Sequence, residues 1–515
     1  MTTAPQTSSR SENSLYPPQQ GKEHPAPFQA FVKGIVPWLV AALAAACLAV
    51  CIVLPKIGAA LVVLVSAYFL LRRILQRPLT GIYCALWIFP IYPLLRAANV
   101  AYGIPIAVPG TRPWCEGILL LVFAGLVLGG ISSRHLRFAF KWDDLPVYLF
   151  FLSGVYGTVV DLTYLSPVVP FFGWLVSLTG ALFYVAIRWI RPDKAQVQNL
   201  LRVFIVTYAI GAVFSLFEYF VRLPFMSKLA MVTRPVLLGG LSGMESAWRV
   251  YPRLQSLLFD ENVWGTLSTF VALYCLATRM IDRPRRASRG WWLLFLLAMI
   301  NLVLTMSRGA LIAFVVSIAV LLMIRGRHRL RLLAAVTAAL TIAGIVIVSN
   351  ANDRRMAYLL YRSNTISSSN LKNGSAVDDR AFQWKQGWEI FELYPSGKGL
   401  GTVGFAAFLS KGGSNSVADG IYFRVLAETG VPGTLLFVSS LAGVGIVLAK
   451  RTRGSVGSVR MLGMTLFAFH IGFCVQSIGA NTYDYYYVPA LFWLLFGCFV
   501  SLAERQRLDR PQIAP

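Results

Sequence analysis

Charged residues are scarce in this chain of 515 residues, at 13% of the total, which is about half of the share in a typical soluble domain. Hydrophobic residues make up 57%, and they recur in blocks of about 16 to 22 residues, the length of a helix that crosses a bilayer. These blocks exclude a disordered chain, a secreted disulfide scaffold and an ordinary cytosolic enzyme. The composition therefore predicts an all-α polytopic integral membrane protein.

Residues that bind metals or form disulfides are few. The seven cysteines include no Cys-x-x-Cys pair, and Cys47 and Cys51 share a helix face on which we interpret them as small apolar fillers. The four histidines have no metal-binding spacing, and no Ser-His-Asp order, His-Glu-x-x-His motif or outer-face Asp-x-Asp stands out. We therefore expect neither a metal nor another cofactor.

Acidic residues are also few: there are 22 Asp and Glu against 47 Lys and Arg, so the net charge is +25. Such a balance is found in nucleic-acid-binding proteins, but here the basic residues lie in short loops between apolar blocks. That placement indicates membrane topology and contact with lipid headgroups. We expect membrane lipids, and no nucleic acid, as partners.

The positive-inside rule orients the predicted spans. Short turns rich in basic residues, such as 72–77 and 325–331, alternate with turns such as 161–170 and 480–485 that have no Lys or Arg. Both termini are therefore predicted to be cytoplasmic, and the long segments 219–256 and 350–430 to lie outside. About 12 to 14 transmembrane helices are expected, at 36–54, 57–71, 79–95, 115–131, 145–160, 171–188, 201–218, 257–278, 291–306, 310–324, 332–349, 431–449, 461–479 and 486–502.

This pattern divides the chain into consecutive regions. The polar N-terminus has no hydrophobic signal segment and too few apolar residues to fold, so it is predicted to be a disordered cytoplasmic tail. The regions are the tail 1–33, the N-terminal helices and first long outer loop 34–256, the central helices 257–349, the large extracytoplasmic loop 350–430, the C-terminal helices 431–503 and a cytoplasmic tail 504–515.

The large outer loop contains a predicted amphipathic helix, for which Asp378 and Asp379 are the expected N-terminal caps. Its tryptophans would lie at the level of the lipid headgroups, and Arg380 would face water or a cavity. A helix that merely covers the bundle is the alternative. The apolar members at helical spacing are Ala381, Trp384, Trp388 and Phe391.

A glycine-rich run follows, in which Gly399, Gly401 and Gly404 spell Gly-x-Gly-x-x-Gly. The βαβ context of a dinucleotide site is absent. Successive glycines can instead direct backbone N–H groups at an anion such as a pyrophosphate, with Lys398 beside them. A plain flexible turn remains the alternative.

Asp419, Tyr422 and Arg424 stand where the loop re-enters the bilayer. Ionisable residues at such depth are costly and usually functional. Because a low-dielectric site can raise the pKa of an aspartate into the range of a general base, Asp419 is the candidate base.

Two earlier segments point to the same outer face. Arg308 interrupts an apolar block, where it either extends to the interface or binds an anion, and we favour the anion. Arg253, Asp260 and Asn262 precede or begin a membrane helix at its outer end. The arginines of these segments, together with Arg380 and Arg424, supply planar donors suited to phosphate oxygens.

The order of these segments, over about residues 250 to 440, resembles the O-antigen ligase and O-antigen polymerase superfamily of GT-C glycosyltransferases. The matching runs include LTMSRGAL, YPSGKGLGTVGF and ADGIYFRVLAETGVPG. The resemblance implies an undecaprenyl-pyrophosphate-linked oligosaccharide as donor, at the outer face of the bacterial inner membrane. A hydroxyl of the acceptor attacks with inversion, without metal or nucleotide, while arginines matching Arg308 and Arg380 hold the pyrophosphate. A flippase and a chain-length regulator are the protein partners it implies.

Ligases of the superfamily usually have a His-Asn pair where this sequence has Asp419-Gly420. This departure favours a polymerase of surface polysaccharide repeat units, such as O-antigen, capsule or exopolysaccharide. A ligase that moves a finished glycan to lipid A-core or another acceptor is the first alternative. A transporter for an anion or a lipid-linked solute is the second, although the internal repeat typical of transporters is not visible.

Overall fold

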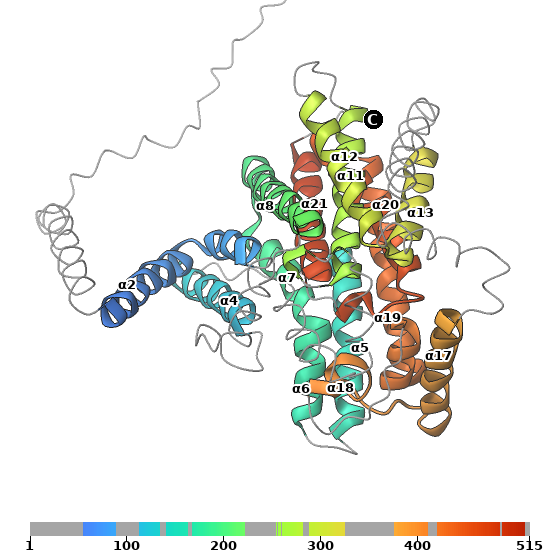
Figure 1. The fold of residues 1–515 in the computed structure, drawn as a ribbon. Coiled ribbons are helices and arrows are strands. Elements are labelled where there is room, and N and C mark those ends of the chain that lie inside the picture. The colour runs from blue at the N-terminus through green and yellow to red at the C-terminus, as the bar shows by residue number, and fades with distance from the viewer. Residues whose placement is uncertain are drawn as a thin grey trace, which may run out of the picture. The chain divides into compact units, whose positions relative to one another are not determined.

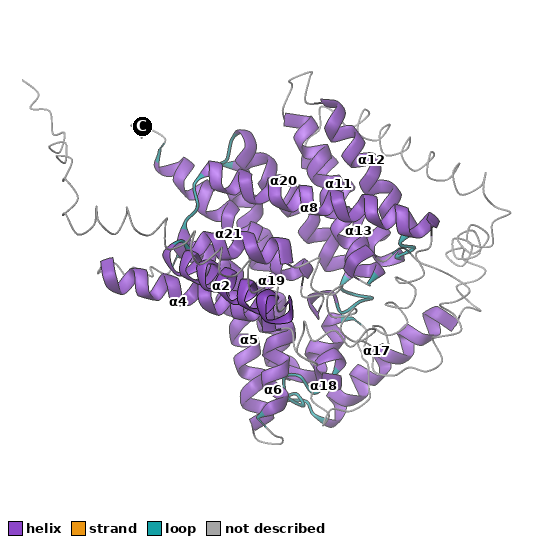
Figure 2. Ribbon diagram, turned by 60° about the vertical axis from the view of Figure 1, so that its left-hand side comes forward, coloured by secondary structure: helices purple, strands orange, loops and turns teal. Residues whose placement is uncertain are grey.

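The computed structural model describes residues 55–88, 113–133, 141–162, 167–221, 254, 256–258, 260–281, 288–324, 375–409, 420–484 and 487–509. Within these ranges the chain forms helices joined by short loops and no strand (Figure 2), which confirms the predicted fold class. The chain divides into two compact units, Met1–Arg72 and Arg73–Pro515. The described part of the first unit, residues 55–72, belongs to helix α2 (Pro55–Gln76).

The second unit contains the remaining described helices (Figure 1). A π-helical segment, Trp174–Leu178, joins α6 to α7, and short 3-10 turns precede α5, α11 and α21. In chain order the helices are Pro78–Ile88, α4 (Pro113–Ser133), α5 (Leu145–Leu162), α6 (Val168–Gly173), α7 (Thr179–Ile190), α8 (Lys194–Val221), α11 (Glu261–Ile281), α12 (Ser288–Leu304), α13 (Arg308–Ile324), α17 (Ser375–Leu393), α18 (Gly404–Leu409), α19 (Ile421–Arg453), α20 (Gly457–Gln476) and α21 (Tyr487–Leu508).

Five of the described helical segments are long and apolar enough to cross a membrane: Val168–Ile190, Lys194–Val221, Ile421–Arg453, Gly457–Gln476 and Tyr487–Leu508. Each of them overlaps a predicted span. The second of these segments, α8, exposes an apolar stripe at spacings of three and four residues, which is the face that a helix presents to lipid. The stripe consists of Val206, Ile210, Val213, Phe217 and Phe220. The protein is therefore a multi-pass membrane protein.

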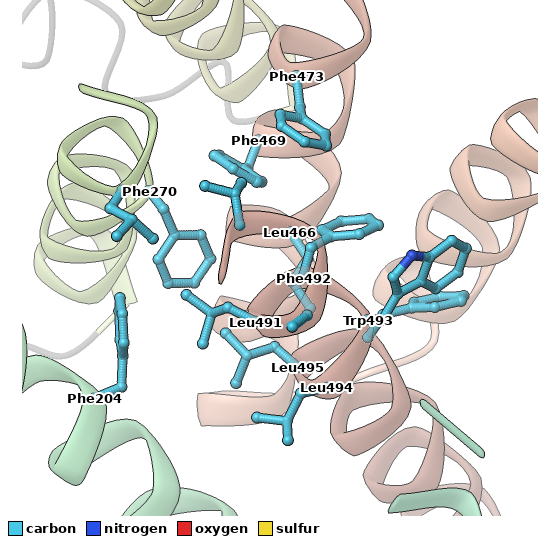
Figure 3. Packing of buried hydrophobic residues seen from close by; sticks show 14 of the residues in the cluster. Phe204, Phe270, Leu466, Phe469, Phe473, Leu491, Phe492, Trp493, Leu494 and Leu495 are labelled. Carbon is cyan, nitrogen blue, oxygen red and sulfur yellow. The ribbon is translucent and has the colours of Figure 1, made fainter. Parts of the chain in front are cut away.

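The core of the second unit lies where α11, α20 and α21 meet (Figure 3). Every residue of α21 from 488 to 503 is buried, as expected of a helix that is apolar on all sides. Aromatic rings join the three helices: Phe270 meets Phe469 at 5.3 Å between ring centroids, and Phe473 meets Phe492 at 6.3 Å. Around this core, α7 packs along α21 and α5 along α19.

A cluster of ion pairs joins the start of α5 to the ends of α7, α19 and α21. Arg188 Nε lies 2.7 Å from Asp144 Oδ1, and Arg188 Nη1 lies 3.1 Å from Glu504 Oε2. Arg451 pairs with Asp143 and Lys141 with Glu504 in the same cluster. The positive-inside rule assigns these four helix ends to one side of the membrane, and the structure brings them together.

The structure changes the expected starts of two helices in the outer loop. Helix α17 begins at Ser375, so the predicted caps Asp378 and Asp379 lie within the helix and not at its first residue. Helix α19 begins at Ile421, and its part after Gly430 coincides with the span predicted from residue 431, which a helical segment of the loop precedes. The two parts meet at a kink at Gly430, where φ is 58° and ψ is −165°.

Candidate functional site

The first segment of α19, residues 421–429, positions two of the predicted site residues, Tyr422 and Arg424. The kink at Gly430 sets the direction of this segment. At the kink the backbone of α19 lies very close to the glycine-rich run, since a Cβ atom at position 430 would lie 2.4 Å from the carbonyl oxygen of Pro395. Only glycine lets this helix pass so close to the glycine-rich run. The Tyr422 hydroxyl donates a hydrogen bond of 3.0 Å to the carbonyl oxygen of Cys474, which ties the segment to α20.

Arg424 is the centre of a buried charge cluster. Its side chain is 2% exposed, and its Nη2 lies 3.1 Å from Asp484 Oδ1 while its Nη1 lies 3.5 Å from Glu428 Oε2. The same Nη1 donates to Ser177 Oγ at 3.1 Å, and Ser177 is carried by the π-helical segment, a feature that often marks functional sites. Both Nη atoms of the guanidinium are thus paired within the protein, with two carboxylates and a serine hydroxyl, so the geometry favours a structural role for Arg424. Its contact with a substrate stays a prediction.

The glycine-rich run 395–404 is fastened to α19 by the Glu428 carboxylate. Glu428 Oε1 accepts hydrogen bonds from the N–H groups of Gly401 at 3.0 Å and Val403 at 3.2 Å. Two backbone N–H groups thus converge on a carboxylate of the same protein, whereas binding of a pyrophosphate by the glycine-rich run stays a prediction.

Further backbone bonds fix the rest of the run. Lys398 N donates to Ala427 O at 2.9 Å, Gly399 N to Glu428 O at 2.8 Å, and Leu400 N to Gly157 O of α5 at 3.0 Å. These bonds hold the loop between α5 and α19, so it is a packed element and not a flexible turn. The Lys398 side chain lies over the ring of Tyr394, with Nζ 5.9 Å from the ring centroid.

A second group of predicted residues gathers at the starts of α11 and α13. Asp260 caps α11, since its Oδ1 accepts the N–H groups of Asn262 at 2.8 Å and Val263 at 3.0 Å. Asn262 Oδ1 accepts a hydrogen bond of 2.7 Å from Ser307 Oγ. Arg308 is the first residue of α13 and is half-buried.

The last turn of α20 lies between the two groups. Gln476 Nε2 donates to Thr266 Oγ1 of α11 at 2.8 Å, and its side chain fills the space beside Gly309. One residue later, Ser477 O accepts the N–H of Ile421 at 3.0 Å. The start of α13, the end of α20 and the start of α19 therefore form one connected region.

The other predicted residues are placed only in part. Arg380 belongs to α17, which packs against α19. Trp384 of α17 stacks on Phe423 at 5.5 Å, whereas Trp388 is exposed, so the two tryptophans serve different faces. Arg253 and Asp419 lie outside the described residues.

Sequence reasoning missed several residues of this region: Ser177, Ser307, Glu428, Gln476 and Asp484. The spacing of Arg424 and Glu428, four residues apart on a helix, is a signal for an ion pair. Asp484 is an acidic residue in a short turn, which gives a weaker signal. The two serines and Gln476 have no signal in the sequence, because only the packing of distant helices brings them to the site.

One comparison with known proteins matches part of the chain. Residues 293–438 match a family model described as O-antigen ligase, and this stretch runs from α12 into α19 and includes the glycine-rich run. No curated protein matches the chain. The match includes Arg308, Arg380 and Arg424, but ends before Gln476 and Asp484 and begins after Asn262.

Proposed function

We propose, from the assignment of this chain to the O-antigen ligase and polymerase superfamily, that it is a polymerase of lipid-linked polysaccharide repeat units. The donor is a glycan on undecaprenyl pyrophosphate, and the reaction takes place at the outer face of the bacterial inner membrane. The observation that carries the proposal is the position of Arg308. This half-buried cation begins α13 inside the matched stretch, next to a buried polar region that α11 and α20 complete.

The proposed reaction is a displacement at the anomeric carbon of the donor. The acceptor hydroxyl attacks from the face opposite the pyrophosphate, the bond to the pyrophosphate oxygen breaks, and Asp419 takes the proton. The guanidinium groups of Arg308 and Arg380 stabilise the negative charge that develops on the departing pyrophosphate. Because these cations take up the charge, the proposal requires neither a metal nor a nucleotide.

The choice of a polymerase rests on Asp419-Gly420, which stands where superfamily ligases usually have His-Asn. The second candidate is a ligase, which the description of the matched family favours. Both share the donor and the leaving group, and they differ in the acceptor. A polymerase needs two lipid-linked substrates, whereas a ligase needs one and a separate acceptor.

A single experiment separates these functions. The purified protein receives a synthetic undecaprenyl-pyrophosphate repeat unit as its sole substrate, and the products are separated on a gel. A ladder of lengths supports the polymerase. Donor that disappears only when a separate acceptor is present supports the ligase. Donor that stays intact under both conditions contradicts glycan transfer and favours transport.

The first prediction concerns the two arginines. We expect Arg308→Ala and Arg380→Ala to lower glycan transfer by about a hundredfold or more, since each removes a cation from the leaving group. Transfer on the gel is compared at equal protein abundance. Arg202→Ala, at an exposed site on α8, is the control and should keep its activity. Normal transfer by either variant would exclude that arginine from the pyrophosphate site.

A further inference from the structure

The turn that joins α12 to α13 has a strained backbone. Met306 adopts a φ of 52°, in the left-handed region that residues other than glycine rarely occupy. Its neighbours Thr305 and Ser307 are 0% and 1% exposed. Strain of this kind persists only where the surroundings over-determine the backbone, and it is concentrated at functional sites. The residue that follows the turn is Arg308.

Ser307 connects this turn to α11. Its Oγ donates to Asn262 Oδ1 at 2.7 Å and accepts the N–H of Ala310 at 3.4 Å. The second bond makes Ser307 the N-terminal cap of α13. One hydroxyl therefore fixes both the start of α13 and its distance from α11.

The partner of Ser307 is itself held in place. Asn262 N donates to Asp260 Oδ1 at 2.8 Å, and Asn262 O accepts a bond of 2.6 Å from Thr266 Oγ1. Thr266 in turn bonds to Gln476 of α20. The turn is thus enclosed on one side by a hydrogen-bonded chain that runs from α13 through α11 to α20.

The turn is enclosed on other sides as well. Leu254 N donates to Leu304 O at 3.1 Å, at the last residue of α12. On the side of α11, a Cβ atom on Gly265 would lie 3.0 Å from Thr305 Oγ1 and 2.9 Å from Ala310 Cβ. The backbone before and after Arg308 therefore has little freedom to move.

We propose that Ser307 is a positioning residue, which holds the start of α13 so that Arg308 meets the pyrophosphate in a fixed direction. The Ser307–Asn262 hydrogen bond carries this role, and Asn262 then acts through Ser307 and not on the substrate. The inference rests on the proposed function. Its physical basis is that charge stabilisation in a transition state depends on donors that are oriented before the reaction.

Steady-state kinetics on the lipid-linked repeat unit test this role. Ser307→Ala should lower kcat by about tenfold to a hundredfold, the range expected for a displaced catalytic group, with KM nearly unchanged. Ser307→Thr keeps the hydroxyl and should restore most of kcat. If Ser307→Ala does not fold, Asn262→Ala is used instead. It removes the same hydrogen bond by deleting the acceptor, and Asn262 is only half-buried.

The matched control is Ser440→Ala. Ser440 is 0% exposed, and its hydroxyl donates to Pro146 O at 2.6 Å, between α19 and α5. Its removal deletes one buried hydrogen bond between helices and should lower the melting temperature, though less than Ser307→Ala, which also removes the N-terminal cap of α13. Its kcat should not change.

A double-mutant cycle separates positioning from general destabilisation. In an Arg308→Lys background, Ser307→Ala should lower kcat much less than it does in the wild type, because the group that Ser307 positions has already been altered. Equal effects in both backgrounds, or equal losses of kcat in Ser307→Ala and Ser440→Ala, would overturn the role. If the wild-type protein itself shows no transfer, the proposed function fails and this role fails with it. If the wild type is active and Ser307→Ala has the same kcat, only the positioning role is overturned.

Discussion

At the scale of single residues, the Glu428 carboxylate connects the glycine-rich run to Arg424. Its side chain is 1% exposed, one carboxylate oxygen accepts two backbone N–H groups of the glycine-rich run, and the other faces Arg424. A buried carboxylate is costly unless it is paired and hydrogen-bonded. Removing Glu428 leaves the N–H groups of Gly401 and Val403 without an acceptor, whereas Arg424 keeps Asp484 and Ser177.

We expect Glu428→Ala to lower the free energy of unfolding by about 3 kcal/mol, because it leaves the buried N–H groups of Gly401 and Val403 without an acceptor, at about 1 to 3 kcal/mol each. Glu428→Gln keeps an oxygen for the two N–H groups and should cost less. Thermal unfolding in detergent measures both. Limited proteolysis should also cut Glu428→Ala within 395–404, where the loop loses its anchor.

The control for this prediction is Glu389→Ala. Glu389 makes an exposed ion pair with Lys385, at 3.6 Å between Nζ and Oε1, and exposed pairs of this kind contribute less than about 1 kcal/mol. A Glu428→Ala protein as stable as Glu389→Ala would contradict the role assigned to the carboxylate.

Single residues of the site were predictable to different degrees. Arg308 and Arg424 stand out in the sequence, because a charged residue inside an apolar block is energetically costly and usually functional. Of the partners of Arg424, Glu428 is indicated by its spacing of four residues. Ser177 and Asp484 do not stand out, since they come from two other segments that are 307 residues apart in sequence. The sequence therefore identifies the charge, and the fold supplies its distant neighbours.

At the scale of elements, α19 and the glycine-rich run fix each other's path where Gly430 of α19 lies against Gly397 of the run. A Cβ atom on Gly397 would lie 2.6 Å from Glu428 O, and one on Gly430 would lie 2.8 Å from Gly397 N. The kink in α19 and the path of the loop are thus set by the same contact. The sequence places a membrane span after Gly430, but it does not show that the helix continues before it.

Gly430→Ala should destabilise the protein by about 2 kcal/mol or more. With φ at 58° and ψ at −165°, this backbone is nearly confined to glycine and costs another residue about 1 to 3 kcal/mol, and the Cβ atom of an alanine would also collide with Pro395 O. Gly129→Ala in α4, where no atom lies within 4 Å of the added carbon, should instead raise stability by up to about 1 kcal/mol. Melting temperatures of the two variants test the contrast, and a neutral Gly430→Ala would show that the crossing is not tight.

At the scale of the whole molecule, the charged residues separate into two regions of different character. The cluster around Arg188 joins helix ends that the positive-inside rule assigns to the cytoplasm. The region around Arg308 and Arg424 joins helix ends that the same rule assigns to the outside. Since lipid-linked glycans are transferred at the outer face in the proposed function, the glycine-rich run must be accessible from that face.

Cysteine labelling tests this orientation. In a background without the native cysteines, Ser396→Cys at an exposed position of the glycine-rich run should react with a membrane-impermeant maleimide in intact cells. Lys194→Cys, exposed at the start of α8, should react only after permeabilisation. The reverse pattern would invert the topology and contradict an outer-face reaction.

The sequence by itself determined the membrane class and the approximate position of the five long apolar helices, and it singled out Arg308 and Arg424 as charges in apolar segments. These follow from local properties: an apolar run of sufficient length is a span wherever it packs, and a charge inside such a run is visible without its neighbours. Only the tertiary structure decided that two N–H groups of the glycine-rich run bind Glu428, that α19 begins in the loop, and that Ser307 connects α13 to α11. Each of these depends on contacts between segments far apart in the chain, and the energy of such contacts is set by packing geometry and not by composition.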